Sequence, residues 1–218
     1  MKISALQRVW WHVWRLVFLL WFKLCYRLKI EGKENRCTRL GEGKVGTLYV
    51  ANHQSFFDPI IVGLGTNKIY YSLARKTLWD NKFLGWCMTS LAGMPVDQES
   101  PETSVMKKCI EVLEAGEDLL IFPEGSRGDS PAAEEFQPGV MLIMKRAKPI
   151  VVPVAIDGAF DVWARKDKKP RLFGHVGVKL GTPRTAESIL EMKPRDALAA
   201  LRAEIEGMRV ELGEILPK

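Results

Sequence analysis

Residues 47–59 read TLYVANHQSFFDP, and the rest of the chain is organised around this stretch. Its first five residues are mostly apolar and partly β-branched, as in a buried strand. Asp58 is a good helix N-cap residue, and Pro59 suits the first helical position, where its missing N–H costs nothing. The sequence therefore predicts a strand that ends in a turn and leads directly into a helix.

The turn contains a candidate catalytic pair, His53 and Asp58. Five positions correspond to about 140° around an ideal helix, so the two residues could not share a helical face, but across a turn their side chains can meet. A neutral imidazole can then take a proton from an attacking hydroxyl, while the carboxylate fixes its tautomer and stabilises the imidazolium. The alternative is that Asp58 only caps the helix and His53 is an ordinary turn residue.

A second informative stretch, residues 119–128, reads LLIFPEGSRG. An apolar strand becomes a loop with Glu124, Gly125, Ser126 and Arg127, and ligands of α/β sheets bind at such strand ends. Arg127 could bind a phosphate bidentately, and glycines let backbone N–H groups approach an anion. The alternative is a solvated turn with a Glu124–Arg127 ion pair.

The other elements alternate between strands and helices. The sequence predicts an α/β fold with a mixed, largely parallel sheet flanked by helices and preceded by an N-terminal amphipathic helix at the membrane interface. Pro153, inside the apolar stretch 149–156, suggests a bulge or an edge strand. We expect a membrane-interface segment over residues 1–30 and one catalytic domain over 31–218. Further strands are expected at 69–74, 93–98, 149–156 and 172–180, and helices at 76–91, 139–147 and 194–215.

The net charge of +6 comes from the N-terminus, because residues 1–30 carry six basic residues and no acid. A nucleic-acid-binding protein would more often spread its basic residues over a recognition surface, so we expect no nucleic-acid partner. The cysteines Cys25, Cys37, Cys87 and Cys109 lack zinc-ligand spacing. They are expected to be free thiols, and no metal site is predicted.

The first thirty residues predict an amphipathic helix with an aromatic side, formed by Trp10, Trp14, Val17, Phe18 and Trp21, and an opposite basic side. The longest stretch without a charge or histidine runs only from 16 to 22, whereas a membrane span needs about 20 apolar residues. We therefore expect a peripheral protein on the cytoplasmic face of a membrane, with its tryptophans at headgroup depth. A true span and a helix packed on the protein's own core are the alternatives.

Four stretches resemble, in order, the motifs of the lysophospholipid acyltransferase family, which includes the 1-acylglycerol-3-phosphate acyltransferases. Residues 52–59 match NHxSxxDP and residues 122–127 match FPEG[ST]R. Residues 93–97 and 152–156 resemble the second and last blocks of the family. The resemblance covers roughly residues 30–185.

The resemblance implies transfer of a fatty acyl group from acyl-CoA or acyl carrier protein to the free hydroxyl of a lysophospholipid, foremost lysophosphatidate to give phosphatidate. His53 would be the general base, oriented by Asp58, and residues 124–127 would hold the acceptor's phosphate. Members of the family need no cofactor, and the hydroxyl attacks directly. The sequence agrees with direct attack, since it has no G-x-S-x-G nucleophile elbow.

One position departs from the family. Many members carry an arginine about where Gln98 stands here, and that arginine is thought to bind the acceptor's phosphate. Arg75 or Lys76 could substitute for it, or the acceptor could be another lysophospholipid or an aminolipid. Two rival functions remain open: a lipid-binding protein without catalysis, and a hydrolase that uses the same histidine and aspartate to activate water.

Overall fold

The predicted strand–turn–helix unit is formed by β2 (Thr47–Ala51) and α2 (Asp58–Thr66). The computed structural model describes residues 2–36, 45–97 and 102–217. Strand β2 is buried along its whole length and pairs in parallel with β5 (Leu119–Ile121) on one side and β6 (Ile150–Asp157) on the other. This central position explains why both faces of β2 are apolar.

The described residues form one sheet with the strand order β1-β7-β6-β2-β5-β3-β4, and β8 also pairs with β6. Its five parallel pairings and two antiparallel ones confirm the predicted mixed, largely parallel sheet. The remaining strands are β1 (Lys29–Glu31), β3 (Tyr71–Arg75), β4 (Gly93–Val96), β7 (Gly177–Leu180) and β8 (Arg184–Thr185).

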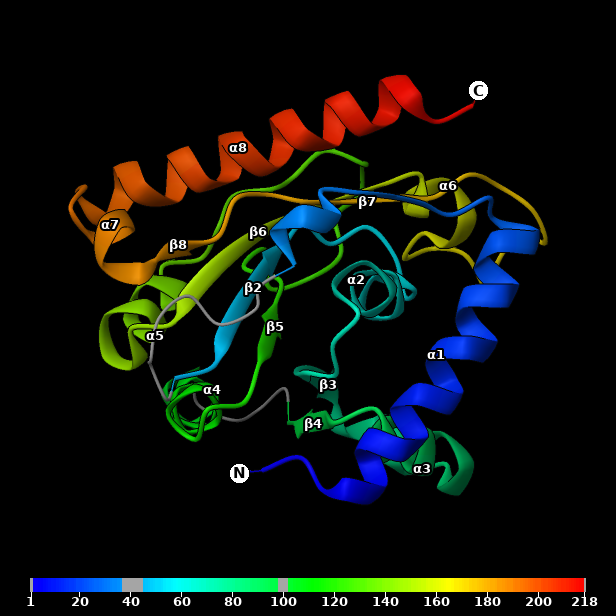
Figure 1. Cartoon of the computed structure of the whole chain (residues 1–218), viewed down its shortest axis with the longest axis horizontal. Helices are drawn as coiled ribbons and strands as arrows, with labels where there is room; N and C mark the ends of the chain where they lie inside the picture. The colour runs from blue at the N-terminus through cyan, green and yellow to red at the C-terminus, as the bar shows by residue number, and fades with distance from the viewer. Residues whose placement is uncertain (1, 37–44, 98–101, 218) are drawn as a thin grey trace.

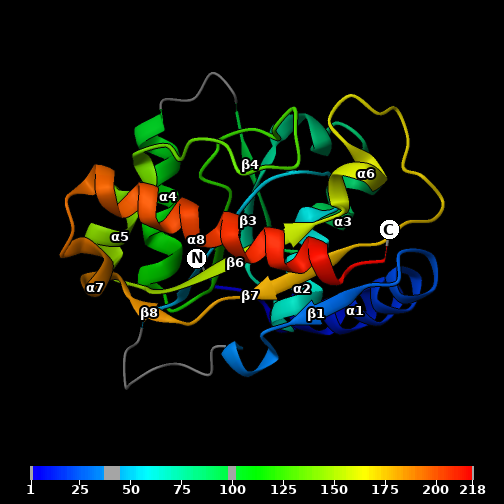
Figure 2. The ribbon, with the colours of Figure 1, turned by 90° about the horizontal axis from the view of Figure 1, so that it is seen from above.

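Helices cover both faces of the sheet (Figures 1 and 2). Tyr49 and Val152 pack toward α1 (Ala5–Cys25), α2 and α6 (Ala159–Trp163). Their neighbours Leu48 and Val151 point the other way. That second face is covered by α4 (Glu102–Glu114), α5 (Gly139–Ala147), α7 (Ala186–Leu190) and α8 (Pro194–Ile215). Successive residues of one strand thus supply two separate cores.

Two local expectations need correction: the edge alternative for the strand that contains Pro153, and the uninterrupted helix over 76–91. Strand β6 lies inside the sheet rather than at its edge, and Pro153 falls between the residues that pair with β8 and those that pair with β7. The missing N–H of proline is accommodated in that gap. The helix expected over 76–91 is divided into a 3-10 turn, Lys76–Trp79, and α3 (Lys82–Ser90), because the Asn81 side chain accepts from the N–H groups of Phe83 and Leu84.

Helix α1 corrects the expected orientation of the N-terminal segment. Trp10 and Trp14 contact Trp86 of α3, and Trp21 contacts Phe57, so the aromatic side packs on the protein. The prediction that the tryptophans face a membrane is therefore wrong. The exposed side of α1 is an aliphatic stripe made of Leu6, Val9, Val13, Leu16, Val17, Leu20 and Leu24.

No helix among the described residues is long and apolar enough to cross a membrane. Helix α1 is joined to the sheet by β1, whose three residues pair with β7. The division that we expected after residue 30 falls inside β1. Phe22 and Tyr26, at the end of α1 and just beyond it, are buried in the core beside α2.

Candidate active site

The candidate site lies at the carboxyl edge of the parallel strands. His53 follows β2, Glu124 follows β5 and Arg75 is the last residue of β3. Because these strands run in parallel, their carboxyl ends meet at the same edge of the sheet. Two motifs separated by seventy residues are thus brought together, and the His53 backbone N–H donates to Oε1 of Glu124 at 3.0 Å.

His53 and Asp58 form a hydrogen-bonded pair across the turn. Nδ1 of His53 is 2.7 Å from Oδ2 of Asp58, whose side chain is completely buried. The same oxygen also accepts from the backbone N–H groups of Gln54, at 2.6 Å, and Ser55, at 2.7 Å. A carboxylate oxygen that already accepts two hydrogen bonds requires a donor from the imidazole. In the neutral imidazole the proton is therefore on Nδ1 and the lone pair is at Nε2, the arrangement of a general base.

The turn itself is fixed by neighbouring polar groups. The Asn52 side chain donates to the Ile156 carbonyl at 2.9 Å and accepts from the Ile156 N–H at 2.8 Å, which ties the end of β2 to β6. Asp58 does not cap α2, contrary to the alternative above, because its carboxylate binds the N–H groups of the preceding turn. The sequence predicted the position of the turn correctly. The Asp58 carboxylate, expected to cap the helix, stabilises the turn before it instead.

The second motif holds His53 from its other side. The His53 ring stacks on Phe122, with ring centroids 4.0 Å apart and planes inclined by 13°. The Gly128 N–H donates to the His53 carbonyl at 3.1 Å, so residues 124 and 128 bind the two backbone groups of the histidine. The His53 side chain retains 18% exposure. The ring is therefore held in one orientation while one edge stays accessible.

Glu124 is a positioning residue within this arrangement. Its side chain is buried, and in the described part of the chain its Oε2 has no hydrogen-bond partner. Burial raises the pKa of Glu124 to about 7, although the hydrogen bond from the His53 N–H opposes the shift. The predicted alternative of a Glu124–Arg127 ion pair is absent from the described contacts. Glu124 binds the histidine backbone instead.

Arg127 brings a positive charge to this edge of the sheet, with no ion-pair partner among the described residues. Its guanidinium carbon lies 3.4 Å from the centre of the Phe56 ring, and its buried Nη1 has no hydrogen-bond partner among the described residues. Burial lowers the pKa of Arg127, and the nearby positive charges of Arg75 and Arg165 lower it further. Three guanidinium groups that repel one another define a place where an anion is stabilised.

The other predicted site residues are placed less directly. Lys76 forms an exposed ion pair with Asp97 at 3.7 Å. Of the two residues proposed to replace the missing arginine, Arg75 is the one whose charge lowers the pKa of Arg127. Gly125 is exposed, adopts a φ of +77° and donates its N–H to Phe122, as a tight turn requires. Ser126 is exposed at the tip of this turn. Gln98 lies outside the described residues.

Sequence reasoning missed three aromatic residues. Phe122 supports the histidine ring, Phe56 carries the arginine, and Trp163 of α6 contacts Phe56 with centroids 4.6 Å apart. Phe56 and Phe122 stand inside the motifs, next to the polar residues that they support, and that adjacency was an available signal. Trp163 is distant in sequence, and no pattern around it indicated a contact with the site.

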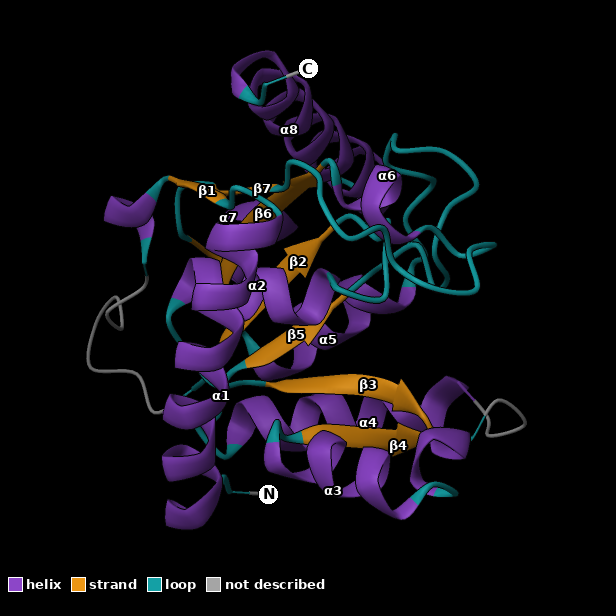
Figure 3. Ribbon diagram, turned by 90° about the vertical axis from the view of Figure 1, so that its right-hand side faces the viewer, coloured by secondary structure: helices purple, strands orange, loops and turns teal. Residues whose placement is uncertain are grey.

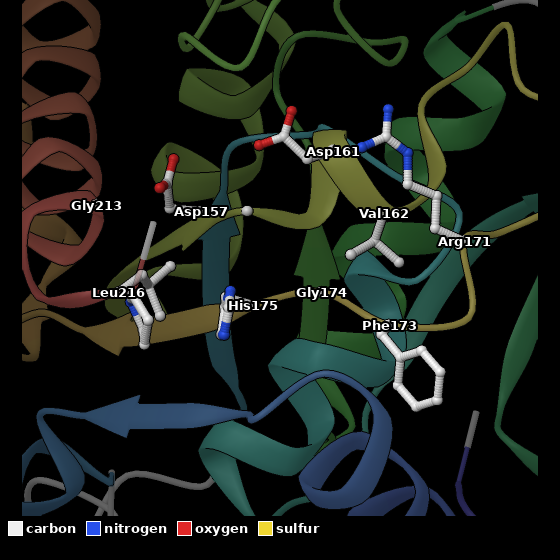
Figure 4. Close-up of a pocket in the computed structure, with 11 residues that line it drawn as sticks. Asp157, Asp161, Val162, Arg171, Phe173, Gly174, His175, Gly213 and Leu216 are labelled. Atoms are coloured by element: carbon white, nitrogen blue, oxygen red, sulfur yellow. The ribbon is translucent and has the colours of Figure 1, made fainter.

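Three further features bear on ligand binding: potential metal ligands, free thiols and a pocket away from His53. Among the described residues no cluster of three or more histidine, cysteine or acidic side chains could hold a metal ion. Cys25, Cys87 and Cys109 are free thiols, and Cys37 lies outside the described residues. A separate pocket of about 370 Å³ lies between α6, the segment that leads into β7 and the end of α8 (Figure 4). Its wall includes Asp157, Asp161, Val162, Arg171, Phe173 and His175, and none of the predicted site residues.

The chain belongs to the Acyltransferase family, whose model matches residues 27–157. It is 27% identical to the 1-acyl-sn-glycerol-3-phosphate acyltransferase of Bacillus subtilis, over 80% of this chain and 82% of the relative. It is 30% identical to the chloroplastic 1-acyl-sn-glycerol-3-phosphate acyltransferase LPAT1 of Arabidopsis thaliana, over 61% of this chain. The chain spans only about a third of the Arabidopsis protein, since the match covers 36% of that length.

The fold is shared with the crystal structure of the 1-acyl-sn-glycerophosphate acyltransferase PlsC from Thermotoga maritima. The two chains superimpose with a TM-score of 0.78 over 97% of this chain and 81% of the other, at 21% identity. At that identity the likeness shows the fold. The match spans α1 as well as the sheet, so the described chain is covered almost throughout.

Proposed function

We propose that the protein transfers a fatty acyl group from a thioester to the free hydroxyl of lysophosphatidate, giving phosphatidate. The observation that carries the proposal is the joint placement, at one edge of the sheet, of an Asp58-oriented His53 and of Arg127, whose buried Nη1 has no partner among the described residues. A base that can accept a hydroxyl proton then stands beside a cation that can bind the phosphate of the same acceptor.

The reaction needs one base and no covalent enzyme intermediate. Nε2 of His53 removes the proton of the acceptor hydroxyl as its oxygen attacks the thioester carbonyl. Asp58 stabilises the resulting imidazolium through the 2.7 Å hydrogen bond to Nδ1. The tetrahedral intermediate then collapses, the carbon–sulfur bond breaks, and the thiolate takes the proton from Nε2 as the free thiol. Histidine thus returns to its starting state.

The acceptor's phosphate is assigned to Arg127, with Arg75 as a second cation. A charge-assisted hydrogen bond contributes roughly 1.5–3 kcal/mol, so a second guanidinium would offset the arginine that Gln98 replaces. Glu124, Gly125 and Ser126 shape the loop that holds Arg127. The acyl donor is either acyl-CoA or acyl carrier protein, which present the same thioester, and no cofactor or metal takes part. If Arg75 fails to substitute, the acceptor is another lysophospholipid or an aminolipid.

The protein is expected to work on a membrane surface, on its cytoplasmic face, with the aliphatic stripe of α1 in contact with lipid. Withdrawing a 16-carbon chain from a bilayer would cost on the order of 10 kcal/mol at about 0.8 kcal/mol per methylene, so a docked active site avoids that cost. Removing residues 1–30 would also remove two of the three residues of β1 and the buried Phe22, so substitutions in the stripe are the better test of this contact.

The proposal is tested by acyl transfer from oleoyl-CoA to lysophosphatidate in mixed micelles, with the variant His53→Ala. We expect the wild type to form phosphatidate and the variant to lose at least about a hundred-fold in rate, as general-base catalysis contributes that much or more. Substantial turnover by the variant would exclude His53 as the base. Release of free fatty acid without phosphatidate would identify the hydrolase, and lipid binding without either product would identify the non-catalytic binding protein.

A further inference from the structure

The strap that joins α6 to β7 combines strong positive charge with exposed apolar side chains. We define the strap as residues 165–173, which read RKDKKPRLF. It has five basic residues and a single acid, Asp167, whose carboxylate accepts from the N–H of Ala164, just before the strap, at 3.0 Å. Leu172 and Phe173 follow directly and are 78% and 71% exposed. The match to the family model ends before this segment begins.

The apolar end of the strap lies beside the end of α1. The Gly174 N–H donates to the Cys25 carbonyl at 3.1 Å, and the Tyr26 hydroxyl donates to the Arg171 carbonyl at 2.9 Å. Leu24, the last residue of the aliphatic stripe, is 77% exposed. Leu24, Leu172 and Phe173 are therefore the three most exposed large apolar side chains of the described chain, and they come from neighbouring segments. Figure 4 shows Phe173 pointing from the strap toward the side where α1 lies.

The other end of the strap is attached to the catalytic turn. Trp163 is the last residue of α6, two residues before the strap; its carbonyl accepts from the Ser55 hydroxyl at 2.8 Å, and its ring contacts Phe56. Lys166 forms an ion pair with Asp129, two residues beyond Arg127, at 3.1 Å. The strap is thus a fixed connection between the exposed apolar end of α1 and the loops that hold His53 and Arg127. Figure 3 shows α1 and the loops around α6 on the side of the molecule that faces the viewer.

We infer that the strap is a second membrane-binding element, with Leu172 and Phe173 inserting among lipids and its basic side chains binding the headgroups of anionic phospholipids. A single surface helix can roll about its own axis, and a second contact at one end prevents that rotation. Together α1 and the strap orient the catalytic edge toward the bilayer. The inference rests on the proposed membrane association and extends it to a site outside α1. Charge complementarity selects an anionic bilayer as the partner.

The test is binding of the full chain to extruded vesicles of phosphatidylcholine, with and without phosphatidylglycerol, measured by flotation. The double variant Leu172→Ser/Phe173→Ser should bind both kinds of vesicle about ten-fold or more weakly, because partial burial of two such side chains is lost. The triple variant Lys166→Gln/Lys168→Gln/Lys169→Gln should weaken binding only to anionic vesicles, by up to roughly five-fold per charge, and added salt should abolish the difference.

Matched controls are available on the opposite side of the molecule, where Figure 1 shows α5 and α7. Leu142→Ser/Met192→Ser removes two apolar side chains that are each 41% exposed, and Lys145→Gln/Arg146→Gln removes two charges from α5. Both controls should bind like the wild type. All these substitutions are at exposed positions, so unchanged thermal unfolding checks that the fold is kept.

Wild-type binding by both strap variants, with loss on Leu20→Ser/Leu24→Ser, would overturn the inference and leave α1 as the sole contact. A second result would also overturn the inference: unchanged vesicle binding by the triple variant together with weaker binding of that variant to acyl carrier protein. The basic residues would then bind the acyl donor and not the membrane. The vesicles contain no acyl donor or lysophospholipid. The result is therefore independent of acyl transfer, and a failure of the proposed reaction is recognised separately in the micelle assay.

Discussion

The substitution Asp58→Asn tests the role of the buried carboxylate with little change in shape. The asparagine side-chain oxygen can keep accepting the hydrogen bonds that Oδ2 receives from Gln54 and Ser55, so the turn should persist. What is lost is the negative charge beside Nδ1 of His53. For charge centres about 4 Å apart and an effective dielectric constant of about 20, the carboxylate stabilises the imidazolium by about 4 kcal/mol. This energy corresponds to a factor of about a thousand in kcat.

The assay compares kcat for phosphatidate formation by the wild type, Asp58→Asn and the control Asp161→Asn, which removes an exposed carboxylate from α6. We expect the control to retain wild-type kcat and Asp58→Asn to lose two to four orders of magnitude, within the range of about 10² to 10⁴ typical of general-base catalysis. Circular dichroism at the assay temperature checks that the variant is folded. A folded Asp58→Asn enzyme with kcat within ten-fold of the wild type would refute the reasoning.

Two other substitutions probe the second motif. Arg127→Gln should lower kcat/KM for lysophosphatidate by about 10- to 200-fold, equivalent to roughly 1.5–3 kcal/mol, while Arg146→Gln on α5 should not, as steady-state kinetics with both variants can show. The pKa of Glu124 is raised from 4.5 to about 7 in the folded protein. The protonated carboxyl therefore contributes fully to the free energy of unfolding below pH 4.5, and this contribution is lost as the pH rises through 7. Glu124→Gln should therefore gain stability over the wild type by up to roughly 3 kcal/mol between pH 5 and pH 8 in urea unfolding, and a pH-independent difference would contradict the assigned pKa.

The local part of the site could be predicted from the sequence because its determinants are close together in the chain. His53 and Asp58 meet across a turn that the strand before it and Pro59 after it already specify. Helices α5 and α8 begin and end where their apolar periodicity and terminal residues indicated. In each of these cases the signal and the structure fall within one segment, so no distant partner decides the outcome.

The orientation of α1 could not be predicted in this way. Besides the expected aromatic and basic sides, that helix has an aliphatic side, and the pattern alone does not tell which of the two apolar sides packs on the protein. The choice depends on Trp86 and Phe57, which belong to other elements. The position of Pro153 inside the sheet likewise depends on where β7 and β8 pair with β6, and Arg127 rests on an aromatic pair completed by Trp163. These contacts are set by tertiary packing, which residue spacing does not encode.

The most direct test of the central claim is the ratio of kcat/KM for lysophosphatidate to that for the monoacylglycerol with the same acyl chain, measured with the wild-type protein and oleoyl-CoA. The two acceptors share the reacting hydroxyl and the apolar chain and differ in the phosphate. If His53 activates a hydroxyl that Arg127 positions through the phosphate, lysophosphatidate should be preferred by at least about ten-fold. Equal rates with the two acceptors, or no acyl transfer to either, would contradict the claim that this is a lysophosphatidate acyltransferase.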